Sequence, residues 1–168
     1  FVRDKDANSA CYMIAEITAW AAEQNKTLYQ ILKEIYKEFD FYKEGLLSLT
    51  KKGISGIEEI KNLMHKFRTT PPTQILGSDI VEIKDYKSSV SKNVKSGVET
   101  TINLPKSDVL QFFTEDGTKI SIRPSGTEPK IKFYFGIKAK LNNIADFEVV
   151  NNELNERINK LIKLFSEE

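Results

Sequence analysis

The chain has 168 residues, of which 40% are hydrophobic and 29% are charged, and this excludes an intrinsically disordered protein. Twenty-five basic residues balance twenty-four acidic residues, so no global field draws the protein to nucleic acid or to a membrane surface. Any anion-binding site must therefore be local.

The sequence contains one cysteine, Cys11, which excludes an internal disulfide and is typical of a reducing compartment. Cys11 lies in an apolar helical pattern, so we interpret it as a small core residue. The pattern predicts neither a signal peptide nor a membrane-spanning segment, and we expect a cytoplasmic protein without a membrane partner. Because the chain begins at Phe1 without a Met, we expect it to be part of a larger protein.

The first 40 residues predict two helices. After a charged lead-in, Ala10, Ile17 and Ala21 share one face of a first helix, with Asp6 or a neighbour placed to cap it. Thr27 opens a second helix, with Gln30 in capping-box spacing. The short link between the helices predicts an antiparallel hairpin. The second helix carries an apolar stripe of Leu28, Ile31, Leu32, Ile35 and Phe39.

Residues 41–53 break the helical period and favour a domain boundary. We place it between residues 1–45, the end of one domain, and residues 46–168, the next. Ser55 then opens a third helix, which Pro71-Pro72 ends.

The C-terminal half predicts a sheet. Residues 79–84 alternate as a strand, and the polar run 87–97 favours a surface loop. Residues 109–114 and 119–122 read as strands joined by a turn, and an amphipathic helix follows near residue 147. The pattern predicts an α+β fold, a mostly antiparallel sheet with flanking helices.

The stretch 123–130 lies between strand-like runs and has the chemistry of a phosphate clamp. Arg123 presents a planar fork to two oxyanion oxygens, and Lys130 adds a point charge. Ser125 and Thr127 offer hydroxyl donors. Gly126 can adopt positive φ, which would let successive backbone N–H groups converge on an anion.

The other members of this stretch have supporting roles. Pro124 and Pro129 restrict the backbone on both sides of the loop. We expect Glu128, a carboxylate that would repel phosphate, to point outward or to hold Arg123 or Lys130. An ordinary tight turn with solvated Arg and Lys is the alternative.

Other candidate residues carry weaker signals. We interpret His65 as a surface residue without a base partner and Trp20 as a packing residue. No Cys/His spacing suggests zinc, and we expect no metal site in this chain.

Read as a string, Arg123-Pro124-Ser125-Gly126-Thr127-Glu128-Pro129-Lys130 closely resembles the phosphate-binding loop of the α-D-phosphohexomutases, the family of phosphoglucomutase and phosphomannomutase. The resemblance implies that Arg123, Ser125, Gly126, Thr127 and Lys130 contact a substrate phosphate. It also implies the family's TATA-binding-protein-like C-terminal domain, preceded by a helical hairpin left from the preceding α/β domain.

A second resemblance lies at the other end of the chain. Arg3-Asp4-Lys5-Asp6 before an Ala-rich helix is similar to the family segment in which a Lys reaches the active site, which implies that Lys5 is an active-site cation. The alternative is a solvated charge cluster near a helix start.

The family resemblance also implies a mechanism. A phosphoserine hands its phosphoryl group to the sugar phosphate through an intermediate such as glucose 1,6-bisphosphate, with Mg²⁺ bound by another domain. The nucleophile, metal and sugar-recognition motifs do not occur in this sequence. The expected function is therefore that of a fragment, inactive alone, that clamps the non-transferred phosphate and works with the remaining domains of the same chain.

Two other functions stay open. The chain could be a stand-alone anion- or protein-binding module without catalysis. A nucleic-acid binder is disfavoured, because alternation points Tyr134 away from Phe133 and Phe135 and the net charge is near zero. Among sugars, Lys130 and the lead-in resemble the glucose and mannose phosphate branches of the family more than the pentose or glucosamine phosphate branches, which implies a glucose or mannose phosphate.

Overall fold

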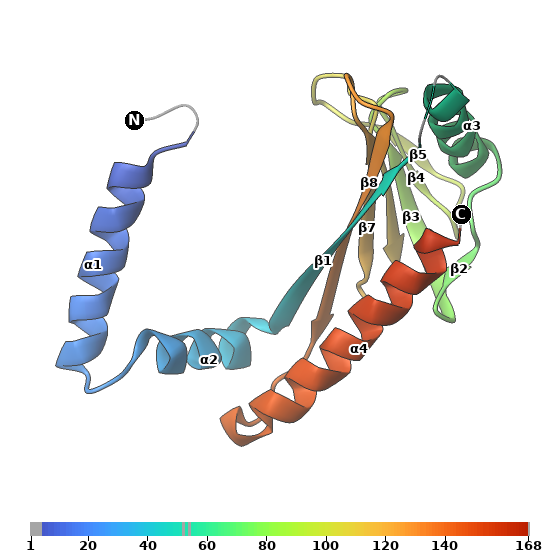
Figure 1. Cartoon of the computed structure of the whole chain (residues 1–168). Coiled ribbons are helices and arrows are strands. Elements are labelled where there is room, and N and C mark those ends of the chain that lie inside the picture. Colours follow the sequence, from blue (N-terminus) through green and yellow to red (C-terminus); the bar gives the residue numbers. More distant parts are fainter. Residues whose placement is uncertain (1–4, 52, 54, 168) are drawn as a thin grey trace. The chain divides into compact units, whose positions relative to one another are not determined.

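The computed structural model describes residues 5–51, 53 and 55–167. Along the chain the elements are α1, α2, β1, α3, β2 to β8, the short 3-10 helix η1 (Ile144–Asp146) and α4 (Figure 1). The chain divides into two compact units, Phe1–Phe41 with Ala139–Val150 and Tyr42–Lys138 with Asn151–Glu168. The first unit is mostly helical, and the second is built on a sheet.

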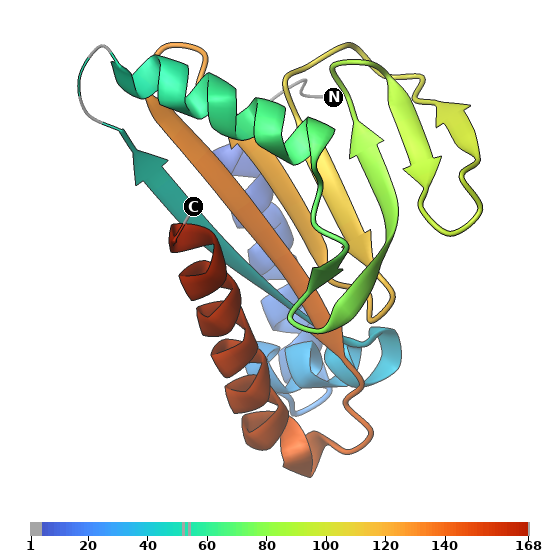
Figure 2. The same ribbon diagram turned by 90° about the vertical axis from the view of Figure 1, so that its right-hand side faces the viewer.

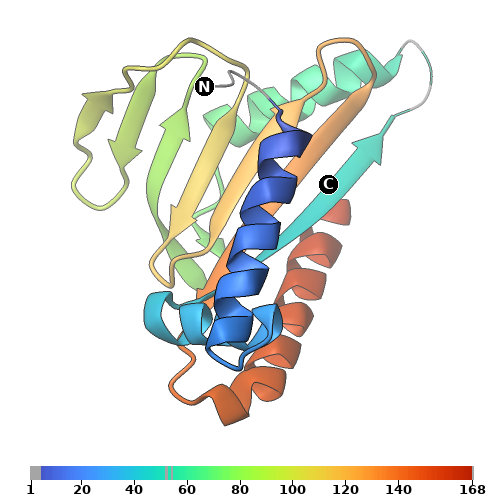
Figure 3. The same cartoon turned by 90° about the vertical axis from the view of Figure 1, so that its left-hand side faces the viewer.

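The first unit begins with the two helices that the sequence predicts, α1 (Ala7–Glu23) and α2 (Leu28–Phe39), joined by a short connection. The two helices lie at a steep angle to each other and not in the antiparallel arrangement expected (Figure 1 and Figure 3). Asp6 caps α1 by accepting a hydrogen bond from the Ser9 N–H at 3.1 Å. The expected capping box at the start of α2 is also present.

Most side chains of α1 are exposed. Ala21 is the one buried residue of this helix, whereas Cys11 is exposed, so its interpretation as a core residue is wrong. Trp20, expected to be a packing residue, is half exposed. Helical periodicity identifies an apolar face, but it does not establish that another element of the chain covers that face.

An aromatic cluster forms the core of the first unit. Phe41 stacks on Tyr36 and on Phe147, with ring centroids 4.2 Å and 4.9 Å apart. Tyr29 meets Phe147 edge-on at 5.6 Å, and the Lys33 ammonium lies 4.2 Å from the Tyr29 centroid. These contacts tie α2 to the first turn of α4.

The second unit contains the predicted antiparallel sheet. Its strand order is β1-β8-β7-β6-β3-β4-β5, with β2 paired to β3 outside this path. Every pair whose register is known is antiparallel. The strands are β1 (Phe41–Thr50), β2 (Gln74–Ile75), β3 (Ser78–Asp85), β4 (Val90–Asn93), β5 (Glu99–Thr101), β6 (Leu110–Thr114), β7 (Lys119–Pro124) and β8 (Lys130–Ala139).

Helices α3 (Ser55–Thr69) and α4 (Phe147–Ser166) cover one face of this sheet (Figure 2). Phe67 of α3 and Phe165 of α4 both contact Phe133, with ring centroids 6.1 Å and 5.2 Å apart. This α+β architecture confirms the predicted fold class. The core on this face includes Leu110, Phe112, Ile120, Ile122, Ile131, Phe133, Phe135 and Ile137.

A glycine allows α4 to approach β1. A Cβ built on Gly45 would lie 2.6 Å from Cγ2 of Ile158, closer than packed carbon atoms tolerate. The missing side chain therefore lets the helix lie directly on the strand.

The opposite side of the sheet is the open face. Neither α3 nor α4, the helices of this unit in the part of the chain that the structure describes, covers it. Strict alternation along β7 and β8 places polar and small residues there. On these two strands the open face carries Lys119, Ser121, Arg123, Lys130, Lys132, Tyr134, Gly136 and Lys138.

Two segments differ from expectation. The run 87–97, predicted as a surface loop, contains β4, which pairs with β5 as a hairpin. Residues 41–50, read as a break in the helical period, form strand β1. The boundary proposed after residue 45 falls within this strand and stays a prediction.

Candidate anion-binding site

Residues 125–129 form the loop that joins β7 to β8, two strands of one sheet, as the sequence predicts. The Ser125 N–H donates to the Lys130 carbonyl at 2.7 Å and closes the loop. The Lys51 N–H, just after β1, donates to the Pro129 carbonyl at 3.0 Å. These two bonds anchor the loop to the start of β8 and to the residue that follows β1.

A hollow of about 310 Å³ lies at this end of the sheet. This volume is at the lower end of the range for ligand pockets, about 300–1,000 Å³. The lining comes from the loop and from the open face beside it: Arg123, Pro124, Ser125, Gly126, Thr127, Lys132 and Tyr134.

Two cations lie side by side at the hollow. Arg123 of β7 pairs directly with Lys132 of β8 in the antiparallel register, so both side chains lie on the open face. Like charges in directly opposed positions destabilise a sheet. No hydrogen bond or ion pair from the described residues engages either side chain. An anion bound between them would remove the repulsion.

The Ser125 hydroxyl accepts hydrogen bonds from two backbone N–H groups of the loop. Its Oγ accepts from the N–H groups of Thr127 and Glu128 at 3.5 Å and 3.3 Å. Both distances are beyond the usual range for N–H···O bonds, so these are weak contacts. An anion oxygen placed near the Ser125 hydroxyl would offer the same N–H groups a stronger, charge-assisted acceptor.

Gly126 adopts a backbone conformation other than the one considered from the sequence. Its φ lies outside the left-handed region, so the nest geometry that a positive φ would provide is absent. A Cβ built on Gly126 would meet nothing within 4 Å. Neither a left-handed backbone nor close packing therefore requires a glycine at this position. The absence of a side chain leaves open space next to the loop, which a ligand could occupy.

Lys130 lies outside the lining of the hollow. Its ammonium nitrogen is 3.1 Å from Oε2 of Glu128, so Glu128 holds one of the two cations, as expected. The structure thus places Arg123, Ser125, Gly126 and Thr127 together at the hollow and engages Lys130 with a neighbouring carboxylate. Its role as a phosphate contact stays a prediction.

Sequence reasoning missed two lining residues, Lys132 and Tyr134. The signal was present, because strand alternation puts them on the same face as Arg123 once β7 and β8 are paired. The missing information was the register, which assigns Lys132 as the partner of Arg123.

Lys5 belongs to the first unit, where it is exposed and precedes Asp6, the cap of α1. The motif residues Arg3 and Asp4 lie outside the described residues. The role of Lys5 stays a prediction. His65, expected at the surface, is exposed in α3.

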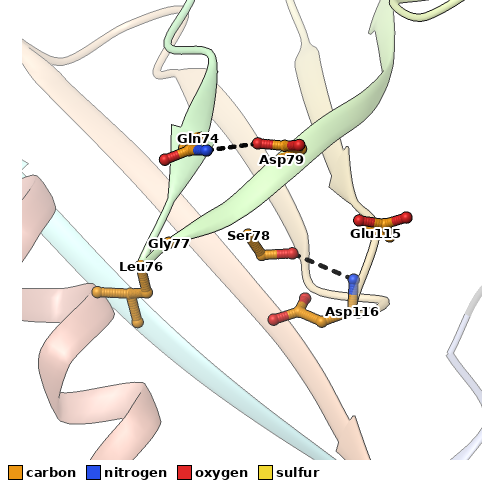
Figure 4. A pocket seen from close by; sticks show the side chains of 7 residues that line it. All are labelled: Gln74, Leu76, Gly77, Ser78, Asp79, Glu115 and Asp116. Carbon is orange, nitrogen blue, oxygen red and sulfur yellow. Dashed lines mark hydrogen bonds between the residues drawn. The ribbon is translucent and has the colours of Figure 1, made fainter.

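A second hollow, of about 420 Å³, is lined by three carboxylates, Asp79, Glu115 and Asp116 (Figure 4). Asp79 accepts a hydrogen bond from the Gln74 side chain, and the Asp116 N–H donates to Ser78 Oγ at 3.2 Å. This concentration of negative charge disfavours phosphate. The hollow at the β7–β8 loop is therefore the candidate anion site.

Asp116 ties the β6–β7 turn to α4. It forms an ion pair with Arg157 and accepts hydrogen bonds from the Thr114 hydroxyl at 2.6 Å and the Thr118 N–H at 3.0 Å. Partial burial raises the pKa of the Asp116 carboxyl, but these hydrogen bonds and the Arg157 charge outweigh it, so the pKa lies below its ordinary value.

The described residues contain no group of three or more histidine, cysteine or carboxylate side chains arranged to hold a metal ion. None of the helices in the described part of the chain combines the length and apolar character needed to cross a bilayer.

Residues 58–150, more than half of the chain, match the family model described as phosphoglucomutase/phosphomannomutase, C-terminal domain. The chain belongs to the phosphoglucomutase/phosphomannomutase family. The match includes the loop 125–129 and the strands that carry Arg123 and Lys132. The resemblance inferred from residues 123–130 is confirmed.

Two similar curated relatives are phosphoglucomutases. The chain is 34% identical over 154 residues to the phosphoglucomutase of Staphylococcus haemolyticus (strain JCSC1435), covering 92% of this chain and 27% of that protein. It is 35% identical over 158 residues to that of Staphylococcus aureus (strain bovine RF122 / ET3-1), covering 94% of this chain and 28% of that protein. The chain thus spans little more than a quarter of the length of these relatives.

A solved structure shows a weaker likeness. The exocytosis-sensitive phosphoprotein pp63/parafusin from Paramecium, in its open form, matches with a TM-score of 0.49 and 16% identity, over 95% of this chain and 27% of that chain.

Proposed function

We propose that this chain supplies the phosphate clamp of a hexose-phosphate mutase, an isomerase that works by intramolecular phosphoryl transfer. The observation that supports the proposal most directly is the facing pair Arg123 and Lys132, two cations without a described partner at the edge of a hollow. The clamp holds the phosphate that is not being transferred, so no bond changes within it.

The lining of the hollow suits a tetrahedral dianion. Arg123 offers a planar fork, Lys132 a point charge, and Thr127 an N–H whose present contact is weak. Phosphoryl transfer depends mainly on positioning and electrostatic stabilisation, so a rigid clamp remote from the reacting atoms still contributes to the rate. The substrate class is a hexose phosphate, with glucose or mannose favoured.

Mg²⁺ and a phosphoserine nucleophile do not fit this chain. The described residues offer no cluster of metal ligands, and the sequence lacks the motifs expected for both groups. We therefore assign both to other domains of the parent protein and derive no step through them. The chain alone is expected to bind phosphate without catalysis.

The first unit is the proposed contact with the remaining domains of the parent chain. Apolar side chains of α1 are widely exposed, including Tyr12 at 80%, Ile14 at 56% and Trp20 at 50%. Exposed apolar side chains of this kind, when they lie together, mark interaction surfaces. We propose a cytoplasmic location and no nucleic-acid partner, in keeping with the balanced charge.

A titration followed by NMR tests the clamp. Glucose 1,6-bisphosphate is added to the 168-residue chain at two salt concentrations, and the amides of Gly126 and Thr127 are followed. We expect saturable shifts near the loop that weaken as salt rises, because the contact is electrostatic.

Matched charge variants complete this test. Arg123→Gln is expected to abolish the shifts, and Lys92→Gln, at an exposed cation of β4 in the same sheet, to leave them unchanged. Shifts that survive Arg123→Gln, or a wild-type loop that does not respond to millimolar ligand, would contradict the proposal.

A further inference from the structure

The open face continues beyond the two cations of the hollow. In the β7–β8 register, Arg123 faces Lys132, and Ser121 faces Tyr134. The face therefore presents a pair of cations followed by a pair of hydroxyl groups. Of this second pair, Tyr134 lines the hollow.

Tyr134 is available to a ligand. Its side chain is 40% exposed, whereas its neighbours in sequence, Phe133 and Phe135, are buried on the helix side. No hydrogen bond from the described residues occupies the Tyr134 hydroxyl. An aromatic ring with an unused hydroxyl, at the edge of a polar hollow, combines an apolar surface with a hydrogen-bonding tip.

The hydroxyl opposite Tyr134 is fixed by the sheet. Ser121 Oγ accepts a hydrogen bond from the Gln111 amide at 2.9 Å, and the Gln111 carbonyl accepts one from the Tyr86 hydroxyl at 3.0 Å. This chain of contacts holds Ser121 in place and leaves its O–H without an acceptor among the described residues.

The spacing of these pairs matches a phosphate ester. Positions two apart on a strand are separated by about 7 Å. A phosphate bound between Arg123 and Lys132 would therefore bring the carbon skeleton that it carries over Tyr134. Gly136 follows on the same face, where the absence of a side chain leaves room for that skeleton.

We infer that Tyr134 is a specificity-determining residue that binds the hydroxyl-bearing carbon skeleton next to the clamped phosphate. Its ring packs on C–H groups of the ligand, and its hydroxyl hydrogen-bonds to a ligand hydroxyl. Such a contact distinguishes a polyol phosphate from inorganic phosphate. It does not select which end of a hexose is bound, so it suits a site that must accept two orientations of one ligand. The inference rests on the proposed phosphate clamp.

Two ligands and three variants test the inference. Dissociation constants for inorganic phosphate and glucose 6-phosphate are measured by NMR titration of the 168-residue chain. We expect wild type to prefer glucose 6-phosphate. Tyr134→Phe should reduce that preference, the ratio of the two dissociation constants, by about two- to tenfold, which is the usual contribution of one hydrogen bond. Tyr134→Ala should lose it entirely, and both variants should bind inorganic phosphate within about twofold of wild type.

The control is Tyr42→Ala, which removes an exposed tyrosine of β1 that does not line the hollow, and it should change neither constant. If Tyr134→Ala does not fold, Tyr134→Phe carries the test. A wild-type chain without preference between the ligands, or a Tyr134→Phe variant that retains the full preference, overturns the inference while leaving the clamp intact. Absence of inorganic phosphate binding in wild type overturns the proposed function itself.

Discussion

Replacing Lys132 by Met tests the position of the phosphate. Lys132 lines the hollow, has no described partner and faces Arg123. A charge-assisted hydrogen bond contributes about 1.5–3 kcal/mol. Since about 1.4 kcal/mol is a factor of ten in affinity, Lys132→Met should weaken phosphate binding by roughly ten- to a hundredfold. The change preserves most of the side chain's apolar stem, so the sheet is left intact.

The matched variant is Lys130→Met, at the position expected from the sequence to contact phosphate. Lys130 lies outside the lining of the hollow and pairs with Glu128. A charge about 7 Å from a phosphate dianion contributes about 1 kcal/mol in water, and physiological salt screens this further. We therefore expect Lys130→Met to weaken binding by no more than about fourfold.

The assay is the dissociation constant of inorganic phosphate, measured by NMR at about 0.15 M salt for wild type and both variants. Thermal unfolding of each variant confirms that the fold is retained. A Lys130→Met variant that weakened binding as much as Lys132→Met would contradict this position of the phosphate, because the Glu128 contact would then be broken when phosphate binds.

Three further predictions concern the catalytic rate, the open space next to Gly126 and the stability of the fold at low pH. In a full-length mutase carrying this chain, Arg123→Ala should lower kcat/KM by about a hundredfold or more, and an unchanged value in steady-state assays would contradict the clamp. Gly126→Ala should leave the melting temperature within about 2 °C of wild type but weaken phosphate binding at least about fivefold, since its Cβ would occupy ligand space. Because the pKa of Asp116 is lowered in the folded state, its stabilisation is present above the unfolded pKa and lost as pH falls below about 4. Asp116→Asn should flatten this part of the stability curve measured by urea unfolding, whereas an unchanged acid slope would show that its contacts contribute nothing.

The loop and its strands were predictable because their signals are local. Gly126 between two prolines marks a turn, and alternation on either side marks the strands. The same alternation correctly placed Tyr134 on the face opposite Phe133 and Phe135.

Register could not be predicted in the same way. Counting symmetrically outward from loop 125–129 would pair Pro124 with Lys130, whereas the structure pairs it with Ile131. A shift of one residue changes every partner across two strands. Lys132 was therefore not predicted as the partner of Arg123, although both residues lie next to the loop in the sequence.

The missed strands have another cause. β1 has apolar residues on both faces, with Leu46 exposed and Leu47 half-buried, so no alternation marks it. In β4 and β5 the side chains are mostly polar and exposed, and Ser91 is the one buried residue of the pair. Strands of this kind are defined by their neighbours in the sheet rather than by their own pattern.

The path of the chain limits which segment can be exchanged between two members of the family. The chain passes from one unit to the other after residues 41, 138 and 150. A piece starting at residue 46 would retain Phe147 but lose Tyr36 and Phe41, the rings that stack on it. That piece would expose an aromatic surface and tend to self-associate. A chimaera between two members of the family therefore has to transfer α2 and Phe41 together with the sheet, so the smallest exchangeable part is larger than the sheet and its two covering helices.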